Sequence, residues 1–200
     1  MDPATQDPKA TMLRYLRAAR ESVLWKVEGL DEHDARRPLT PTGTSMLGLV
    51  THLTWVDCGY LGECFGRTFP EAPPWDLEDP ATDPDADLVA SPDLSLAETL
   101  ALYRRAARWS DETVEQTALD ATGHVPWWGP DRDRPTLHTV LLHLTTETHR
   151  HAGQLDILRE GLDGRIGMRP DVLNLDLETD WAAHVARVQA AADRFGTPDA

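Results

Sequence analysis

Lysine is scarce in this 200-residue chain, which has only Lys9 and Lys26. Although arginine is far more common, the 19 basic residues are outnumbered by 34 Asp and Glu residues, and the formal net charge is -15 with a sequence pI near 4.8. Binding to a nucleic-acid backbone needs clustered cations that displace counterions. The composition therefore argues against a nucleic-acid partner.

Long apolar runs are also missing. The hydrophobic fraction of 40% is ordinary for a globular protein, but no stretch approaches the roughly 20 apolar residues that cross a bilayer. The first ten residues, MDPATQDPKA, lack the basic segment and apolar run of a secretory signal. We therefore expect no membrane partner and a cytoplasmic location.

Cysteine is limited to Cys58 and Cys64, six positions apart in a segment with helical periodicity. In a helix this spacing corresponds to about 600° of turn and roughly 9 Å along the axis. The two thiols would then lie on different sides of the helix, which does not suit a disulfide. Both cysteines are expected to be reduced.

Apolar residues at three- and four-residue spacing predict an all-α protein built on a four-helix bundle. The four helices are expected over residues 11–30, from Thr44 or Ser45 to about Phe65, from Ser95 to about Thr117, and from Thr136 to Gly161 or Gly164. Ser95 and Glu98 have the spacing of a capping box. A shorter helix is expected over Asp180–Phe195.

The segments between these helices are expected to be loops, over Asp31–Pro41, Gly66–Pro92 and Gly123–Pro135. The second is long and rich in Asp and Pro, with Trp75 as its expected anchor. We expect a single domain over residues 1–200, with its core in residues 10–165 and a C-terminal extension over residues 166–200.

Three residues form a candidate metal site. Glu147 and His151 are one turn apart on the fourth helix, so both side chains can reach one ion. His151 also falls on the apolar stripe of that helix. His52 flanks the apolar face of the second helix, where an unpaired imidazole would be costly.

Each of these residues also has a plainer interpretation. A Glu and a His four positions apart are commonly a solvated helix pair, and a lone His at an apolar edge is more often an ordinary core or surface residue than a ligand. However, His143, Glu147 and His151 form a ladder, and burying it without a cation would leave an acid and two imidazoles to be satisfied. Spacing alone leaves both interpretations open.

Three segments resemble the DinB/YfiT-like superfamily, in its actinobacterial branch of mycothiol-dependent enzymes similar to maleylpyruvate isomerase. They are HLTWVDCGYLGECFGR over residues 52–67, PWW over residues 126–128, and VLLHLTTETHRHAGQLDILREGLDG over residues 140–164. The resemblance implies up-down-down-up connectivity and a metal bound by three side chains of the second and fourth helices. Its ligand motifs fall on His52 in VTHLTW and on Glu147 and His151 in ETHRHAGQ.

Three protein ligands with an open fourth position are typical of a catalytic metal site, and two His with one Glu suit zinc, with nickel, cobalt or iron as alternatives. A thiol bound there would lose its proton near neutral pH. We therefore expect a metal-dependent S-transferase that uses mycothiol as co-substrate and a small-molecule electrophile. There are two alternatives. One is a metallohydrolase, and the other is a metal-binding stress-response or ligand-binding protein without catalysis.

Aromatic and acidic residues near these motifs are further candidates. Trp127 and Trp128, together with Trp55, could line a pocket and contact the co-substrate, or could pack in the core. Asp57 and Asp156 lie about one turn from the expected ligands, where they could orient an imidazole or remain solvated helix acids.

Two further expectations concern binding. Arg159 could meet a carboxylate on a substrate, or could pair with a neighbouring acid. Exposed apolar helix faces are compatible with a homodimer, which the sequence does not decide.

Overall fold

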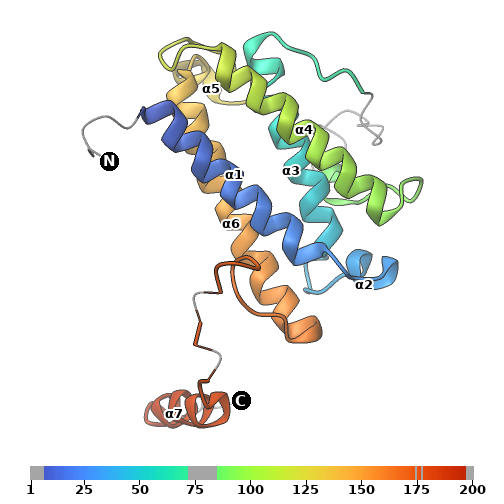
Figure 1. Ribbon diagram of the computed structural model, residues 1–200, viewed down its shortest axis with the longest axis vertical. Helices are drawn as coiled ribbons and strands as arrows, with labels where there is room; N and C mark the ends of the chain where they lie inside the picture. Colours follow the sequence, from blue (N-terminus) through green and yellow to red (C-terminus); the bar gives the residue numbers. More distant parts are fainter. Residues whose placement is uncertain (1–6, 72–84, 174, 177, 197–200) are drawn as a thin grey trace.

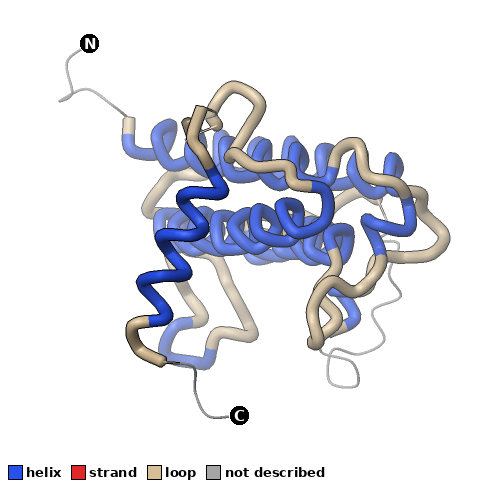
Figure 2. Tube along the Cα trace, turned by 90° about the horizontal axis from the view of Figure 1, so that it is seen from below, coloured by secondary structure: helices blue, strands red, loops and turns tan. Residues whose placement is uncertain are grey.

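The computed structural model describes residues 7–71, 85–173, 175–176 and 178–196, and its regular elements in those residues are all helices (Figure 2). Four long helices form the bundle: α1 (Pro8–Val27), α3 (Met46–Tyr60), α4 (Leu96–Gln116) and α6 (Leu137–Asp163). Figure 1 shows α1 and α6 running in one direction and α3 and α4 in the other. The expected all-α class and up-down-down-up bundle are confirmed.

Most ends of the long helices are where the capping residues predict them. Ser45 and Thr136 cap α3 and α6, and Ser95 with Glu98 forms the complete capping box of α4. Gly164, at φ 78°, ends α6 in the left-handed conformation that favours glycine. Helix α1 starts three residues earlier than expected, because the Asp7 carboxylate accepts a hydrogen bond from the Lys9 backbone N–H.

Several short helices lie in segments that the sequence analysis assigned to loops. They are α2 (Glu32–Arg36), α5 (Gly129–Arg132) and the 3₁₀ helix η3 (Ala86–Leu88). The second long helix ends at Tyr60 rather than near Phe65, and a separate 3₁₀ helix, η2 (Glu63–Phe65), follows it. Gly62 lies between the two helices, and only glycine fits there, because a Cβ at this position would lie 2.2 Å from the Trp109 ring. The expected anchor Trp75 lies outside the described residues.

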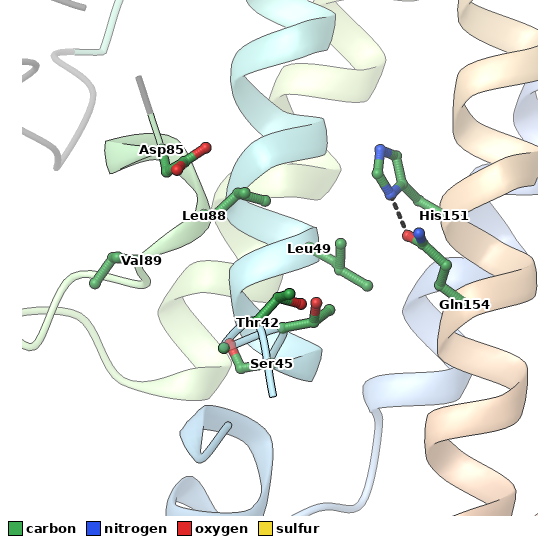
Figure 3. A pocket seen from close by; sticks show the side chains of 10 residues that line it. Thr42, Ser45, Leu49, Asp85, Leu88, Val89, His151 and Gln154 are labelled. Carbon is green, nitrogen blue, oxygen red and sulfur yellow. Dashed lines mark hydrogen bonds between the residues drawn. The ribbon is translucent and has the colours of Figure 1, made fainter. Parts of the chain in front are cut away.

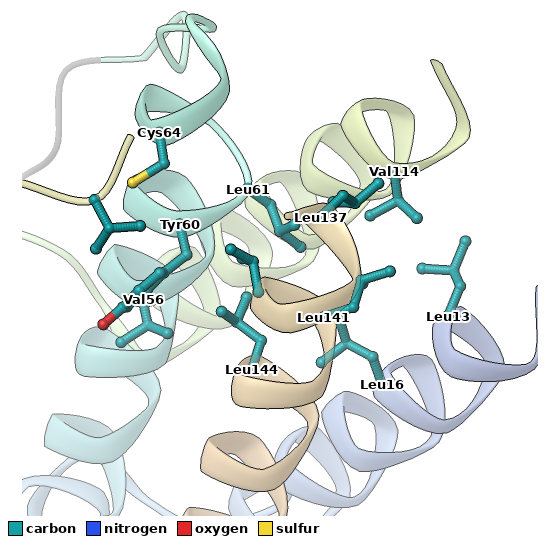
Figure 4. Packing of buried hydrophobic residues seen from close by; sticks show 12 residues of the cluster. Leu13, Leu16, Val56, Tyr60, Leu61, Cys64, Val114, Leu137, Leu141 and Leu144 are labelled. Carbon is teal, nitrogen blue, oxygen red and sulfur yellow. The ribbon is translucent and has the colours of Figure 1, made fainter. Parts of the chain in front are cut away.

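Helix α3 is at the centre of the bundle and is buried on nearly all sides. Towards its C-terminal end, Val56, Tyr60 and Leu61 pack with leucines of α1 and α6 (Figure 4). Its N-terminal half packs in a second cluster with Val23, Tyr103 and Leu155, among others. A polar residue on α3 that faces α6 is therefore held within a rigid apolar frame.

Helix α7 (Trp181–Asp193) is the expected C-terminal helix, capped by Asp180. It has no buried residue, and Figure 1 shows it away from the bundle. Over the described ranges, the helices include none with the length and apolar character required to cross a membrane.

Candidate metal centre

His52 of α3 and the pair Glu147 and His151 of α6 come together in the structure, as their motifs predict. Their ligand atoms all lie within 4.8 Å of one another. Glu147 Oε1 is 3.0 Å from His151 Nε2 and 3.7 Å from His52 Nε2. The two imidazole rings meet edge to face, with centroids 4.9 Å apart. The Nε2 atoms of both rings thus converge on one carboxylate.

The opposite nitrogen of each ring is also fixed. His52 Nδ1 lies 2.6 Å from Asp87 Oδ2, and His151 Nδ1 lies 2.7 Å from the side-chain oxygen of Gln154. A carboxylate and an amide oxygen accept hydrogen bonds, so both Nδ1 atoms carry the proton. Each Nε2 atom then presents a lone pair towards Glu147, which is the tautomer that binds a metal.

The donor atoms of this cluster bear on whether it fits a cation. His52 Nε2 is buried and has no hydrogen-bond partner among the described residues, since 3.7 Å to Glu147 is too long for a hydrogen bond. Two imidazole lone pairs and a carboxylate therefore face one another without a donor between them. Two nitrogens and one oxygen form a donor set that suits a divalent transition metal, and the site fits such an ion.

The pKa of the Glu147 carboxyl is lowered in this site. Burial raises the pKa of the Glu147 carboxyl, but the close contact with His151 and, when the rings are protonated, the charges of His151, His52 and His143 lower it by more, so this pKa lies below the ordinary value. Burial lowers the pKa of His143, although Glu147 acts in the opposite direction. His143 is thus favoured in the neutral form.

Asp87 was not predicted from the sequence, because it lies in the acidic segment before α4, which lacks apolar periodicity. Its 3₁₀ helix, η3, reaches His52 because Gly48 leaves room for it. A Cβ at Gly48 would lie 2.1 Å from the Leu88 carbonyl oxygen. The one available signal was Gly48 itself, a glycine inside an otherwise apolar helix.

The expectation that Asp57 and Asp156 could orient the imidazoles is wrong. The Asp57 carboxylate is buried against Arg20, and Asp156 pairs with Lys26 at 2.9 Å. Each acid faces a cation of α1, because α1 packs against both helices that carry the expected ligands. Asp87 and Gln154 contact the imidazoles instead.

Arg159 is not available to a substrate. Its side chain is 1% exposed and donates hydrogen bonds to the backbone oxygens of Lys26 and Glu28 and to the Asp163 carboxylate. It therefore holds the C-terminal end of α1 against α6, and the alternative of a neighbouring acid is the correct one.

The predicted tryptophans form an aromatic cluster around Tyr60, in which the Trp128 ring contacts His143. The Trp127 and Trp128 indole N–H groups both donate to the Tyr60 hydroxyl at 2.9 Å. Trp127 also contacts the Trp55 ring, and its own side chain remains 44% exposed. The cluster therefore packs against α3 and still presents indole surface to a ligand.

Two cavities lie along α6, near the two ends of the stretch that carries the metal cluster. One, of about 440 Å³, includes His151 and Gln154 together with Thr42 and Ser45 (Figure 3). The other, of about 720 Å³, includes His143, one turn before Glu147, and Trp128. Both volumes fall in the range of roughly 300–1,000 Å³ that is usual for small-molecule sites.

A second group of ligand-type residues, Asp31, His33 and Asp34, lies at the surface. The Asp31 carboxylate caps α2 and that of Asp34 pairs with Arg37 at 2.8 Å. Exposed and already partnered, these groups make a weaker candidate than the cluster between α3 and α6.

The fold and the cluster define a class of protein, the DinB-like helical bundles with a candidate metal centre of two histidines and one glutamate. A family model for mycothiol S-transferases matches residues 11–164, and the chain belongs to this family. The matched range contains all three residues of the cluster.

Comparison with curated proteins gave no match. Among solved structures, the chain is similar to a conserved protein of Enterococcus faecalis, with 15% sequence identity and a TM-score of 0.58. The similarity covers 80% of this chain and all of the other. At this identity it supports the fold alone.

Proposed function

We propose that the protein is a metal-dependent S-transferase that uses mycothiol as the thiol and binds its ion through His52, Glu147 and His151. The observation that carries the proposal is the convergence of the two Nε2 atoms on Glu147, with each Nδ1 proton held by Asp87 or Gln154. Zinc suits this donor set best, and nickel, cobalt or iron are the alternatives.

Bound at this site, a divalent ion would supply Lewis acidity that favours the thiolate over the thiol at neutral pH. The protein residues have separate tasks. Asp87 and Gln154 fix the rotation and tautomer of the two imidazoles. Glu147 contributes a negative charge, which offsets part of the charge of the cation.

The protein has no thiol of its own suited to the reaction. Burial raises the pKa of Cys58 and of Cys64 to about 12, and nearby carboxylates add to the effect. The reactive thiolate would therefore come from a bound small molecule. This supports an external thiol as co-substrate, in agreement with the family.

The cavity beside His151 suits such a thiol. Its lining includes Thr42, Thr44, Ser45 and Gln154, which offer hydroxyl and amide groups. Mycothiol is a cysteinyl pseudodisaccharide with many hydroxyls and no carboxylate, so polar uncharged groups are its natural partners. We place the thiol in this cavity, whose lining does not include Trp127 or Trp128, the tryptophans expected to contact the co-substrate; both donate to the Tyr60 hydroxyl instead.

Metal analysis of wild-type protein and of His52→Ala and His151→Ala tests the ligand set. Both variants are expected to lose the stoichiometric metal that the wild type retains after dialysis, with helix content unchanged by circular dichroism. The matched control is His149→Ala, an exposed histidine of the same helix, which should keep the metal. Retention of metal in both ligand variants would overturn the assignment.

Consumption of mycothiol with a panel of electrophiles, with and without chelator, tests the reaction. Wild-type protein loaded with zinc is expected to consume the thiol, and the His52→Ala variant is not. Metal binding without thiol consumption or saturable thiol binding would contradict the transferase and favour a binding or stress-response protein. The homodimer and the cytoplasmic location remain predictions.

A further inference from the structure

The larger cavity, on the His143 side of the metal cluster, differs in chemistry from the one beside His151. Its lining includes the apolar side chains of Trp128, Pro135 and Leu142 together with two arginines, Arg132 and Arg134. Leu142 is 56% exposed, although it is a large apolar residue. This combination presents an apolar wall with cationic groups next to it.

The two arginines have no ion pair with any described residue. Asp133, which lies between them in the chain, has its carboxylate 3.4 Å from His124. Arginines such as Arg17 and Arg105, by contrast, are held by carboxylates of the protein. Two guanidinium groups at one cavity are therefore not bound to any described carboxylate and can meet an external anion.

The position of this cavity relates it to the proposed reaction. His143, in its lining, is one helical turn before Glu147, whereas His151 belongs to the other cavity. In the order of residues along α6, Glu147 thus lies between the cavity that contains His143 and two arginines and the cavity that contains His151 and several hydroxyl groups. A transferase needs two such sites, one for each substrate.

We propose that the cavity at Arg132 and Arg134 is the electrophile site and that it selects an apolar body carrying a carboxylate. The guanidinium groups would bind the carboxylate, since their planar donors match its two oxygens. Trp128 and Leu142 would contact the apolar body. This inference rests on the proposed function for the identity of the ligand as electrophile, but the binding itself does not require metal or thiol.

Calorimetric titration with 2-naphthoate and with its uncharged analogue 2-naphthylmethanol tests the selection. Naphthoate is expected to bind the full-length wild type about tenfold more tightly, the usual scale for a charge-assisted hydrogen bond. The double variant Arg132→Gln with Arg134→Gln should lose that preference and bind the alcohol as before. Naphthoate binding unchanged in the double variant would overturn the proposal.

Two controls define the site. Arg150→Gln removes an exposed arginine of α6 outside this cavity, and should leave naphthoate affinity unchanged. Intermolecular nuclear Overhauser effects from naphthoate to the Leu142 methyl groups are expected in the wild type. Their absence, with effects to methyl groups elsewhere, would show that the ligand binds at another place and would contradict the proposal.

The same titration with His52→Ala separates this inference from the proposed function. Naphthoate should bind this variant as it binds the wild type, because His52 is not part of the cavity lining. Arginine-dependent binding together with metal retained in the ligand variants would reject the proposed function alone. Loss of metal in those variants without arginine-dependent naphthoate binding would reject this inference alone.

Discussion

Asp87 follows His52 by 35 positions, yet its carboxylate lies 2.6 Å from the imidazole Nδ1. We expect Asp87→Ala to weaken metal affinity about 10–100-fold, the usual effect of removing a partner that orients a metal-binding imidazole. Asp87→Asn should have a smaller effect, because the amide oxygen can still accept the hydrogen bond but carries no charge. Competition with a chromophoric chelator measures both affinities.

The matched control for this series is Asp93→Ala, an exposed acid in the segment between η3 and α4. It should leave metal affinity unchanged. Equal affinities of wild type and Asp87→Ala would show that Asp87 does not orient His52.

The cysteines give a second prediction for single residues. With thiol pKa values of about 12, set first by burial, Cys58 and Cys64 should stay protonated at pH 8. Native protein is therefore expected to react with a disulfide reagent at least tenfold more slowly than denatured protein. The double variant Cys58→Ser with Cys64→Ser should keep thiol transfer, whereas loss of transfer with an intact fold would place a reactive thiol in the protein.

Among single residues, the sequence predicted the candidate metal ligands better than the residues that orient their imidazole rings. Glu147 and His151 share one helix, so their four-residue spacing already implies that they are neighbours. Asp87 and His52 meet only through the path of a long segment without apolar periodicity. Asp57 and Asp156 lie about one turn from the expected ligands, which made the imidazoles one of their two possible roles. Their actual partners, Arg20 and Lys26, lie on a different helix, and spacing along one helix does not show such contacts.

The close contact between α3 and η3 makes Gly48 the next test. Gly48→Ala would place a Cβ 2.1 Å from the Leu88 carbonyl oxygen, so η3 must move away from α3 and take Asp87 with it. We expect weaker metal binding, near that of Asp87→Ala, although alanine is the better helix former. Chelator competition and thermal unfolding measure the two effects.

Gly161→Ala on α6 is the control, because nothing lies within 4 Å of a Cβ at that position. It should keep metal affinity and stabilise the helix by up to about 1 kcal/mol. A Gly48→Ala variant that binds metal like the wild type would show that η3 tolerates the added methyl group without moving Asp87.

The elements that the sequence predicts best are those with strong periodicity and a capping residue. Ser95 and Thr136 mark helix starts through contacts within one turn, which local sequence specifies. The short helix α2 was missed because five residues give no periodic pattern. It is held by distant contacts, such as the hydrogen bond from the Arg36 guanidinium to the Ser91 carbonyl oxygen.

Across the whole molecule, three buried cations connect α1 to the other three long helices. Arg20 reaches Asp57 of α3 and Asp111 of α4, Lys26 pairs with Asp156 of α6, and Arg159 bonds back to the end of α1. A strongly acidic chain thus places scarce positive charges inside the bundle, where removing one partner is costly. Composition alone could not show this, since the partners are distant in sequence.

Helix α7 lies outside this network and has no buried residue. A chain that stops after Glu178 should therefore unfold in urea with a free energy within about 0.5 kcal/mol of the full chain, and it should keep its metal. A chain that stops after Gly164 should lose about 1–2 kcal/mol, because it also lacks the hydrogen bond from Arg165 to the Glu28 carbonyl oxygen. Destabilisation by the shorter deletion that depends on protein concentration would instead place α7 in an interface between two copies of the chain.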